Sequence, residues 1–380
     1  MPRDSRIGRW IESARSYAGI VHGVQRVSRR PIHQVIHTLA IFRLRYGGNP
    51  RFFADAGLVD VHPSHYGDYV DDAAVIPLQR QTTVPHWRYL EENKLAFAAR
   101  CAEAGLPTGE ILGVIVTDAS EVTPWQGAVA RSADELHSML RGIGDAAVII
   151  KLVYGGLGYG VHGATIRHGI PRMDGQLFDA GALLPWLAAQ HRSPSLWLIQ
   201  RRIPPHAGLH ELMPGPGLGT VRIHSFLGAD DGVAIRWAHL KIPGAGQTTD
   251  NFRDGGGTTA IASIDLASGR LRHCVGRRDP SDVLRPSDVH PVSGARVADV
   301  QLPDWEALLT LVRRAALAFP ELPALGWDVA LTPAGPIIIE ANWQFGVTGI
   351  QIAHRIGVRR ELGALLARVT APRASASGLE

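Results

Sequence analysis

Most predicted strands in this chain come in pairs joined by short turns, and this feature limits the fold more than any other. Apolar and β-branched runs lie on both sides of Gly228–Gly232, Ala267–Gly269 and Thr332–Pro336, which are too short to hold a helix. Parallel neighbours would need crossover connections of roughly a dozen or more residues. The sequence therefore predicts an α+β fold with much antiparallel sheet, and not an alternating βαβ fold.

The other periodic segments include helices at both ends of the chain. Residues 1–45 predict two helices separated by Pro31, and residues 46–85, rich in Gly, Pro, Asp and His, are expected to be irregular. Residues 88–104 predict an amphipathic helix that ends at Gly105, and the tail from about Val369 is expected to be disordered. Further strands are predicted at 110–117, 146–153, 163–167, 196–203, 220–227, 233–240, 261–265, 270–275, 326–331 and 337–342, and helices at 134–141, 182–190 and 302–319.

The composition is that of a globular protein and argues against two classes of partner. Hydrophobic residues make up 45% of the chain and charged residues 19%, and no apolar run is long enough to predict an integral membrane segment. A net charge of +4 without a basic block interleaved with aromatics gives no reason to expect nucleic acid. The N-terminus lacks the features of a secretory signal, and Cys101 and Cys274 are expected to be free thiols in the cytoplasm. The arginine-rich face of the N-terminal helices is interpreted as solvated, with a membrane-surface helix as the less favoured alternative.

Lysine is rare in this chain, so its positions are informative. Of the 39 basic residues, 36 are arginine and only Lys94, Lys151 and Lys241 are lysine. A chain that uses arginine for generic positive charge can retain lysine where a compact, flexible ammonium is wanted, such as beside a phosphate. The alternative is chance retention. We favour the functional interpretation most for Lys151.

A glycine run follows the strand that contains Lys151. Gly155, Gly156, Gly158 and Gly160 let the backbone approach a ligand closely and direct N–H groups at phosphate oxygens. The run lacks the lysine of a P-loop, and a strand follows it where a dinucleotide-binding motif has a helix. We interpret the run as a flap that closes over nucleotide phosphates, with a flexible hairpin turn as the alternative.

The last predicted hairpin carries the strongest group of polar residues. If the hairpin is centred on Ala334, Asp328 lies across from Glu340, and Asn342 shares their face. Two carboxylates that face each other in an apolar hairpin repel, and a bound cation would remove the repulsion. Carboxylate and amide oxygens suit Mg²⁺. Two alternatives stay open: arginine side chains could neutralise the carboxylates, and a one-residue shift in register would turn Asp328 to the other face.

Two further groups are weaker candidates on the residues alone. The strand Leu196–Ile203 runs into a Pro-Pro segment and could offer backbone groups to an adenine edge, although an ordinary strand end explains it as well. Arg222 and Lys241 stand on the two arms of the central hairpin, ahead of Asp250–Phe252 and Gly255–Gly257. They could clamp a phosphate or a carboxylate. Surface charge on a two-sided sheet is the alternative for them.

Taken in order, these motifs resemble the ATP-grasp superfamily and, more narrowly, its sugar-transfer-associated family. The resemblance covers roughly residues 85–360, and the Asp-Asn-Phe segment and the last hairpin are its most specific parts. It is carried by the segments NKLAFAARCAEAGLPT (93–108), IIKLVYGGLGYGV (149–161), LIQRRI (198–203), TVRIHSF (220–226), TTDNFRDGG (248–256) and GWDVALTPAGPIIIEANW (326–343).

The resemblance implies an ATP-grasp fold, in which two α+β lobes grip ATP, with a helical N-terminal extension. The expected division is a helical or irregular region at 1–85, a lid lobe with its leading helix at 86–200, a C-terminal lobe with the metal site at 201–368 and a disordered tail at 369–380. Three features depart from the family. Many members have Glu in place of Gln200 and an acidic residue shortly after it for the ribose, where this chain offers only His206 or Glu211. The usual N-terminal Rossmann-like domain is not visible in residues 1–85.

The resemblance also implies a role for each matched residue, with ATP and one or two Mg²⁺ ions as cofactors. Lys94 and Lys151 would contact the α- and β-phosphates, and the glycines would close over the triphosphate. The expected nucleotide-binding residues are Lys94, Lys151, Gly155, Gly156, Gly158, Gln200, Arg201, Ile203 and Asn251, with the Arg201 carbonyl and the Ile203 N–H on adenine. The expected metal ligands are Asp328, Glu340 and Asn342, and the expected catalytic residues facing the transferring phosphate are Arg222 and Lys241.

The implied activity is that of a ligase which activates a carboxylate as an acyl phosphate for attack by an amine or a thiol. A phosphotransferase on the same fold and a non-catalytic nucleotide-binding component of a glycosyl-transfer pathway are the alternatives. The expected partners are small-molecule carboxylate and amine substrates, and a homodimer is compatible with the sequence.

Overall fold

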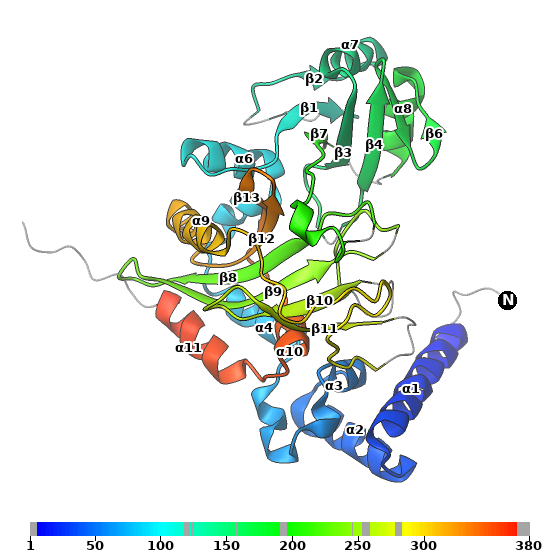
Figure 1. The fold of residues 1–380 in the computed structure, drawn as a ribbon, viewed down its shortest axis with the longest axis vertical. Coiled ribbons are helices and arrows are strands. Elements are labelled where there is room, and N and C mark those ends of the chain that lie inside the picture. The colour runs from blue at the N-terminus through cyan, green and yellow to red at the C-terminus, as the bar shows by residue number, and fades with distance from the viewer. Residues whose placement is uncertain are drawn as a thin grey trace, which may run out of the picture.

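The computed structural model describes residues 6–117, 122, 125–156, 158–190, 196–213, 215–244, 246–252, 259–277 and 283–370, with side chains from residue 17 onward. The predicted Gly255–Gly257 segment and residues 371–380 of the predicted tail lie outside this described part. Figure 1 shows three parts along the long axis: a seven-stranded sheet at one end, a six-stranded sheet in the middle and the N-terminal helices at the other end.

The seven-stranded sheet has the strand order β2-β1-β7-β3-β4-β5-β6. All neighbours are antiparallel except β1 and β2. Two helices pack on one face, through apolar residues that include Leu136, Leu140, Leu183 and Leu187. The strands are β1 (Ile111–Val116), β2 (Val129–Ala130), β3 (Ala146–Leu152), β4 (Val161–Arg167), β5 (Ile170–Met173), β6 (Gln176–Leu177) and β7 (Leu196–Arg201), and the helices are α7 (Ala133–Ile143) and α8 (Ala180–Gln190).

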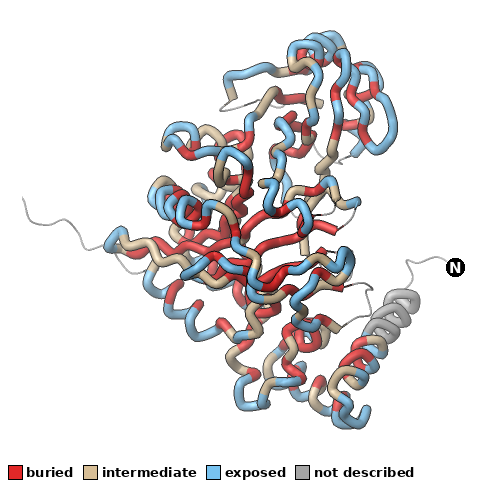
Figure 2. The backbone as a smooth tube through the Cα atoms, in the orientation of Figure 1, coloured by how far each residue is buried: buried red, intermediate tan, exposed pale blue. Residues whose placement is uncertain are grey.

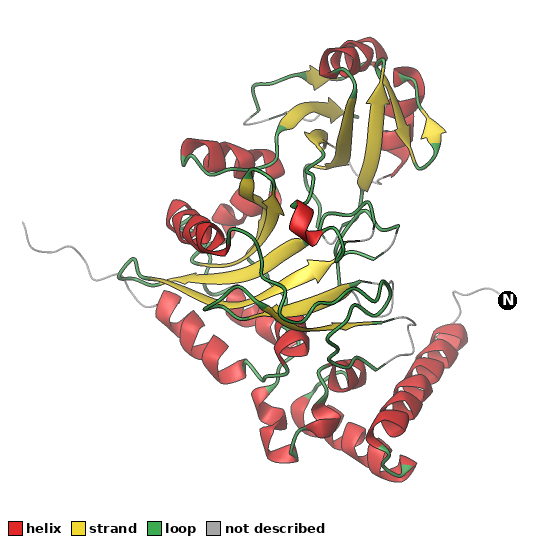
Figure 3. Ribbon diagram, viewed as in Figure 1, coloured by secondary structure: helices red, strands yellow, loops and turns green. Residues whose placement is uncertain are grey.

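The six-stranded sheet is antiparallel and lies between two layers of helices (Figure 3). Its strand order is β11-β10-β9-β8-β12-β13. The strands are β8 (Thr220–Leu227), β9 (Val233–Ile242), β10 (Ala260–Ile264), β11 (Leu271–Gly276), β12 (Ala324–Thr332) and β13 (Gly335–Asn342). Its helices are α5 (Tyr89–Glu92), α6 (Lys94–Glu103), α9 (Trp305–Ala318), α10 (Thr348–His354) and α11 (Arg359–Thr370), with the 3₁₀ turn η4 (Ala207–Leu209) between the sheets. The predicted α+β class is confirmed.

The helix predicted at 88–104 is interrupted. Tyr89–Glu92 ends at Asn93, whose side chain accepts hydrogen bonds from the N–H groups of Leu95 and Ala96 and so starts a new helix at Lys94. This second helix packs on α9, where the rings of Phe97 and Phe319 stack at 5.3 Å. The sequence division of the lobes at residue 200 stays a prediction, and the leading helix of the predicted lid packs with the six-stranded sheet.

The N-terminal region is helical almost throughout. Two long helices separated by Pro31 are confirmed, but the expected irregular stretch 46–85 is a series of short helices. Apolar residues that lie among the Gly, Pro, Asp and His of this stretch, such as Phe52 and Phe53, are buried and pack these short helices against the two long ones. The elements are α1 (Arg6–Ser28), α2 (Ile32–Tyr46), α3 (Pro50–Asp55), η1 (Leu58–Asp60), η2 (Pro63–Asp68), α4 (Asp72–Gln79) and η3 (Pro85–Arg88). No helix in the described ranges is long and apolar enough to cross a bilayer.

Residues 17–79, which we call the N-terminal brace, are hydrogen-bonded to the segment that follows β13. The Asp72 carboxylate accepts hydrogen bonds from the backbone of Val347 at 2.6 Å and of Thr348 at 2.9 Å, which caps α10. The Gln351 side chain both accepts from the Val70 N–H at 3.0 Å and donates to its carbonyl at 2.6 Å. The brace therefore supports the chain immediately after the last strand of the six-stranded sheet.

In the last hairpin the predicted pairing of Asp328 with Glu340 is confirmed, but the predicted centre of the turn at Ala334 is wrong, because Thr332 pairs with Gly335. Asp328 pairs with Glu340 as predicted, but Val329 pairs with Ile338, which belongs to a register one residue different. A β-bulge at Ile339 accommodates the extra residue. Without the bulge, the short turn would place Asp328 opposite Ile339, and the two carboxylates would not face each other.

Candidate functional site

The candidate site is a cavity between the two sheets. It has a volume of about 140 Å³, and a second cavity of about 310 Å³ adjoins it across Lys94, Lys151 and Glu340. The tube in Figure 2 shows the central strands of the six-stranded sheet largely buried, whereas β4, β5 and β6 of the seven-stranded sheet are more exposed. The predicted site residues that line one or both cavities are Lys94, Lys151, Gly155, Gly156, Gly158, Gln200, Arg201, Ile203, Asn251, Asp328, Glu340 and Asn342.

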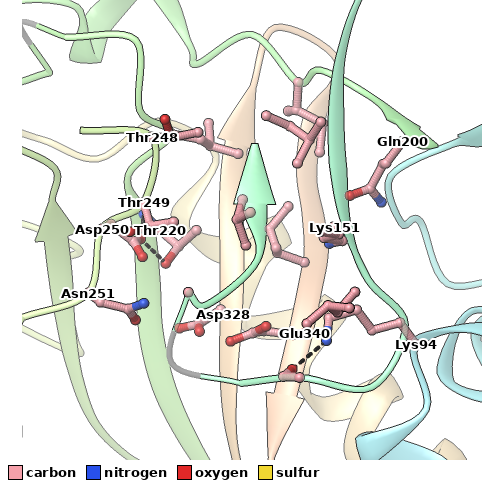
Figure 4. A pocket seen from close by; sticks show the side chains of 18 of the residues that line it. Lys94, Lys151, Gln200, Thr220, Thr248, Thr249, Asp250, Asn251, Asp328 and Glu340 are labelled. Atoms are coloured by element: carbon pink, nitrogen blue, oxygen red, sulfur yellow. Dashed lines mark hydrogen bonds between the residues drawn. The ribbon is translucent and has the colours of Figure 1, made fainter. Parts of the chain in front are cut away.

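All three lysines of the chain meet at this site. Lys94 and Lys151 line the cavity, and Lys241 contacts Asp250 and Asp328, which line it too. The Lys94 ammonium donates to the Gly155 carbonyl at 2.5 Å, so it also holds the start of the glycine loop. Figure 4 shows Lys94 and Lys151 on the same side of the cavity, with the Glu340 side chain between Lys94 and Asp328.

Lys151 differs from the other two because its ammonium has no hydrogen bond or ion pair within the described part of the chain. Its side chain is 9% exposed. Burial, followed by repulsion from Lys94, lowers the pKa of Lys151 to about 8. A buried cation that lacks a counter-ion is costly, and a ligand with negative charge would relieve that cost.

Arg222 and Lys241 are paired with carboxylates. Arg222 donates two hydrogen bonds to Asp328, from Nε at 2.7 Å and from Nη2 at 2.8 Å. Lys241 Nζ lies 3.1 Å from Asp328 and 3.0 Å from Asp250, and Asp250 accepts further bonds from the N–H and hydroxyl of Thr220 at 2.9 and 2.6 Å. Burial acts to raise the pKa of Asp328, but Arg222 and Lys241 outweigh it and hold that pKa well below its usual range. The arginine alternative that the sequence left open therefore holds for Asp328.

The strand register explains this network. Glu340, Asp328, Arg222 and His239 occupy successive cross-strand positions on β13, β12, β8 and β9. Residues directly opposite each other share a face of the sheet, so the row consists of two acids followed by an arginine and a histidine. One acid has a base beside it, and the acid at the edge strand, Glu340, does not.

Glu340 is the less neutralised of the two carboxylates. Burial, and then the charge on Asp328, raise the pKa of Glu340, and its carboxyl lies within hydrogen-bonding reach of Asp328. Glu91, on the wall of the larger cavity, is in a similar position: burial, followed by Glu340 and Glu92, raises the pKa of Glu91 to about 8. This end of the site therefore has more carboxylates than nearby cations can balance.

These residues fit an oxygen-preferring cation. The Asn342 amide nitrogen bonds the Gly326 carbonyl at 3.4 Å, which leaves its oxygen free to bind a cation beside Glu340 and Asp328. No set of three His, Cys, Asp or Glu side chains is close enough to hold a metal within the described residues, so an ion here would have two carboxylates and an amide. Such a set suits Mg²⁺ and does not suit Zn²⁺.

The opposite end of the smaller cavity has an apolar wall and free backbone groups. Ile149, Val161 and Leu218 line it together with Ile203, whose N–H donates no hydrogen bond within the described chain. The Gln200 side chain points to Gly109, where its amide nitrogen donates to the carbonyl at 3.0 Å. These features suit a flat heterocycle with edge acceptors and donors.

The predicted ribose partners are not at this cavity. Within the described residues, neither His206 nor Glu211 lines it, and the His206 ring caps η4 by accepting from the Gly208 N–H at 3.1 Å. Thr248 and Thr249, in contrast, do line the smaller cavity. The hydroxyls at these two positions are the polar groups available beside the heterocycle end.

The glycine loop lies against the segment that contains Asn251. Gly158 has a φ of +72°, and a Cβ there would clash with the Asn251 amide. Only glycine therefore allows the loop to pass this close in this conformation. Gly155, Gly156 and Gly158 line the smaller cavity, so the loop covers the space between the two sheets.

Two residues of the site were absent from the predicted set. Asp250 anchors both Lys241 and Thr220, and the signal for it was its place beside Asn251 in the Asp-Asn-Phe segment. Glu91 stands three residues before Lys94, and no spacing rule singles it out, because the helix break at Asn93 decides where its side chain lies.

The sequence matches the profile of the family described as sugar-transfer associated ATP-grasp over residues 81–366, and the chain belongs to that family. Its fold is the ATP-grasp fold. The resemblance drawn from the motifs is thereby confirmed.

Solved structures with a related fold include three enzymes. D-alanyl-alanine synthetase A from Vibrio cholerae is 12% identical, with 76% of this chain and 68% of that one covered and a TM-score of 0.43. Biotin carboxylase from Campylobacter jejuni is 11% identical (76% and 49% covered, TM-score 0.44), and an L-amino acid ligase from Bacillus licheniformis is 12% identical (77% and 53% covered, TM-score 0.38). The chain spans about half the length of the last two. No curated protein sequence is significantly similar to the chain.

Proposed function

We propose that this protein is an ATP- and Mg²⁺-dependent ligase that joins a carboxylate to an amine, or to a thiol, through an acyl phosphate. The observation that carries the proposal is that Lys94 and Lys151 line one cavity between the sheets together with two facing carboxylates, and that Lys241 contacts Asp250 and Asp328 of its wall. Lysines and a glycine loop together suit a triphosphate, and facing carboxylates suit the cation that accompanies it. Membership of the ATP-grasp family agrees with this assignment.

In this proposal the nucleotide occupies the smaller cavity. Adenine lies against the apolar wall, with the Ile203 N–H and the Arg201 carbonyl at its edge. Lys151 and Lys94 meet the α- and β-phosphates, and a phosphate there would give Lys151 the partner that it lacks. Gln200, Asn251 and the glycine loop close the remaining sides.

The chemistry takes place at the acidic end of the cavity. The substrate carboxylate attacks the γ-phosphorus of ATP, the bond to the β–γ bridging oxygen breaks, and ADP leaves. The amine then attacks the acyl carbon and phosphate leaves. Arg222 and Lys241, held by Asp328, provide positive charge for the transferring phosphate and for the oxyanion of the second step. Asp328, Glu340 and Asn342 would hold Mg²⁺, which when bound neutralises charge on the β- and γ-phosphates.

The first test is thermal unfolding with ADP or a non-hydrolysable ATP analogue, with and without Mg²⁺. A ligand at about 100 times its Kd stabilises the native state by about 2.7 kcal/mol, which raises the Tm by several degrees. We expect an increase that requires Mg²⁺ in the natural protein and is lost in Glu340→Gln. Glu306→Gln, an exposed position on α9, is the matched control.

The second test is phosphate release with pairs of carboxylate and amine substrates. A ligase releases phosphate only when both are present. A stable phosphorylated product without phosphate release would instead identify a phosphotransferase, and nucleotide binding without turnover of any pair would identify a binding component. Both outcomes would overturn the ligase assignment without affecting the nucleotide site.

A further inference from the structure

Helix α2 has exposed apolar side chains in addition to the apolar side that packs into the protein. One side packs Val35, Leu39 and Phe42 into the core of the N-terminal brace. Outside this packed side, Ile36 and Leu44 are exposed, about 80° apart around the helix axis. The flanking Ile32 and Ile41 are also exposed. A surface helix normally turns its apolar side chains toward the core, and exposed apolar side chains that gather on one helix mark an interaction surface.

Leu44 is the most exposed of these four side chains. It is 86% exposed, more than any other large apolar side chain in the described part of the chain. Ile36 is 45% exposed on the same helix. Single exposed apolar side chains need no explanation, but four on one 15-residue helix form a patch.

The patch lies in a strongly basic setting. Residues 17–48 contain five arginines, Arg26, Arg29, Arg30, Arg43 and Arg45, and no aspartate or glutamate. None of these arginines forms an ion pair with a carboxylate in the described structure, whereas residues 49–380 contain 33 acidic and 30 basic residues. Positive charge beyond the needs of the fold is therefore concentrated on α1, α2 and the turn between them.

We propose that α2 and the adjoining turn, residues 26–45, dock on an anionic lipid bilayer, with the exposed aliphatic side chains in the interface and the arginines at the headgroups. Apolar side chains flanked by arginine, without acidic residues, form the pattern of helices that lie in a bilayer interface. The charge argues against a second copy of this face as the occupant, because the two copies would bring ten arginines together. The proposal does not depend on the proposed enzymatic function.

The geometry allows docking and excludes spanning. At 15 residues, α2 is roughly 22 Å long, shorter than the hydrocarbon core of a bilayer. It lies at the end of the molecule remote from the seven-stranded sheet (Figure 1), so its outer side can meet a flat surface without collision with the lobes around the cavity. The protein would therefore contact the membrane surface with one end only.

Flotation of the purified full chain with lipid vesicles tests the proposal. We expect binding to vesicles of phosphatidylcholine with about one third phosphatidylglycerol, little binding to pure phosphatidylcholine, and weaker binding as salt rises. Arg43→Gln/Arg45→Gln should lower the apparent affinity roughly tenfold or more, because each arginine near the surface contributes about a fivefold factor. Leu44→Ser should lower it by roughly tenfold.

Matched controls come from the same chain. Leu177→Ser removes a leucine that is 63% exposed on β6, and Arg313→Gln removes an exposed arginine on α9. Both should leave vesicle binding unchanged. Because the substituted side chains are exposed, all variants should keep the natural Tm, and they should keep the nucleotide-dependent increase in Tm if the natural protein has one.

Three outcomes would overturn the proposal. Equal binding to the two kinds of vesicle would remove the charge argument, and equal binding of Leu44→Ser and the natural protein would remove the apolar one. The third is a dimer in analytical ultracentrifugation that Leu44→Ser converts to a monomer. This result would show that the patch is an interface between two copies of the chain and not a lipid-binding face.

Discussion

The two sheets bring positive charge to the cavity in opposite ways. On the six-stranded sheet, Arg222 and Lys241 are held by buried carboxylates, so their positions are fixed before any ligand arrives. On the seven-stranded sheet, Lys151 is buried without a hydrogen bond or ion pair in the described part of the chain. The first arrangement is a preorganised framework that contributes to stability, and the second costs stability until a ligand binds. The difference indicates which side of the cavity depends on the nucleotide.

The largest expected effect is on folding, from Lys241→Met. Removal of this cation leaves Asp250 and part of Asp328 without a counter-charge, and the loss of one partner from a buried ion pair costs about 3–5 kcal/mol. Urea unfolding measures this change. Lys151→Met is the matched variant, and an equal loss of stability in both would abolish the contrast between the two sheets.

Glu340→Gln should leave the fold intact and reduce ATP turnover by about a hundred- to a thousandfold. The amide can donate to Asp328, but it provides no charge for a metal. Steady-state release of ADP, with Glu306→Gln as the control, measures the effect. Normal turnover in Glu340→Gln would refute the assignment of this carboxylate as a metal ligand.

Lys151→Met should weaken nucleotide binding by about ten- to a hundredfold while the free protein becomes no less stable. The variant loses a hydrogen bond to a charged group, worth about 1.5–3 kcal/mol, and also removes a buried charge that has no partner. Isothermal titration with ADP and urea unfolding test the two parts separately. A stability loss like that of Lys241→Met would mean that this lysine belongs to the framework.

The pH dependence should have opposite signs for stability and for binding. Because burial lowers the pKa of Lys151 to about 8 from 10.5, the native protein binds fewer protons than the unfolded chain between these values, so the contribution of Lys151 to stability rises with pH there. Nucleotide favours the protonated form, so affinity for ADP should fall by about tenfold per pH unit above about 8. Lys151→Met should reduce both slopes, and Lys94, whose pKa is also lowered by burial, would account for what remains. An affinity that rises with pH in the natural protein would contradict this expectation.

The smallest effect concerns the N-terminal brace, which has no charge in the cavity. Asp72→Ala should cost about 1 kcal/mol, because Val347 and Thr348 lose the cap of α10. Hydrogen exchange should show faster opening at those two amides. Asp71→Ala, which removes the cap of α4, should cost a similar amount without changing them.

The parts of the fold with strong local patterns could be predicted from the sequence. Hairpins with short turns, and helices with a clear apolar stripe such as 302–319, were found because local spacing determines them. The short helices of residues 46–85 were not predicted because they are stabilised by contacts with residues up to 300 positions away, such as that of Asp55 with Arg355. The bulge at Ile339 was also invisible, because no residue preference marks it.

The candidate site was predictable where one residue type is chemically specialised. Lys151, the glycines and the Asp328–Glu340 pair were selected for reasons of chemistry, and they lie together. Glu91 was missed because its position depends on the helix break at Asn93, which is a property of the folded chain. The roles assigned to these residues stay predictions until nucleotide binding is measured.

The contacts between the N-terminal brace and α10 also have a consequence for biosynthesis. Val70 and Gln351 are separated by 281 positions, and a ribosome needs roughly a quarter of a minute to a minute to add that many residues. Throughout this time the apolar residues of the brace lack the contacts that Ile352 and Ala353 make in the folded protein. The nascent chain therefore exposes this apolar surface of the brace until its last helices emerge, and we expect chaperones to bind the brace first.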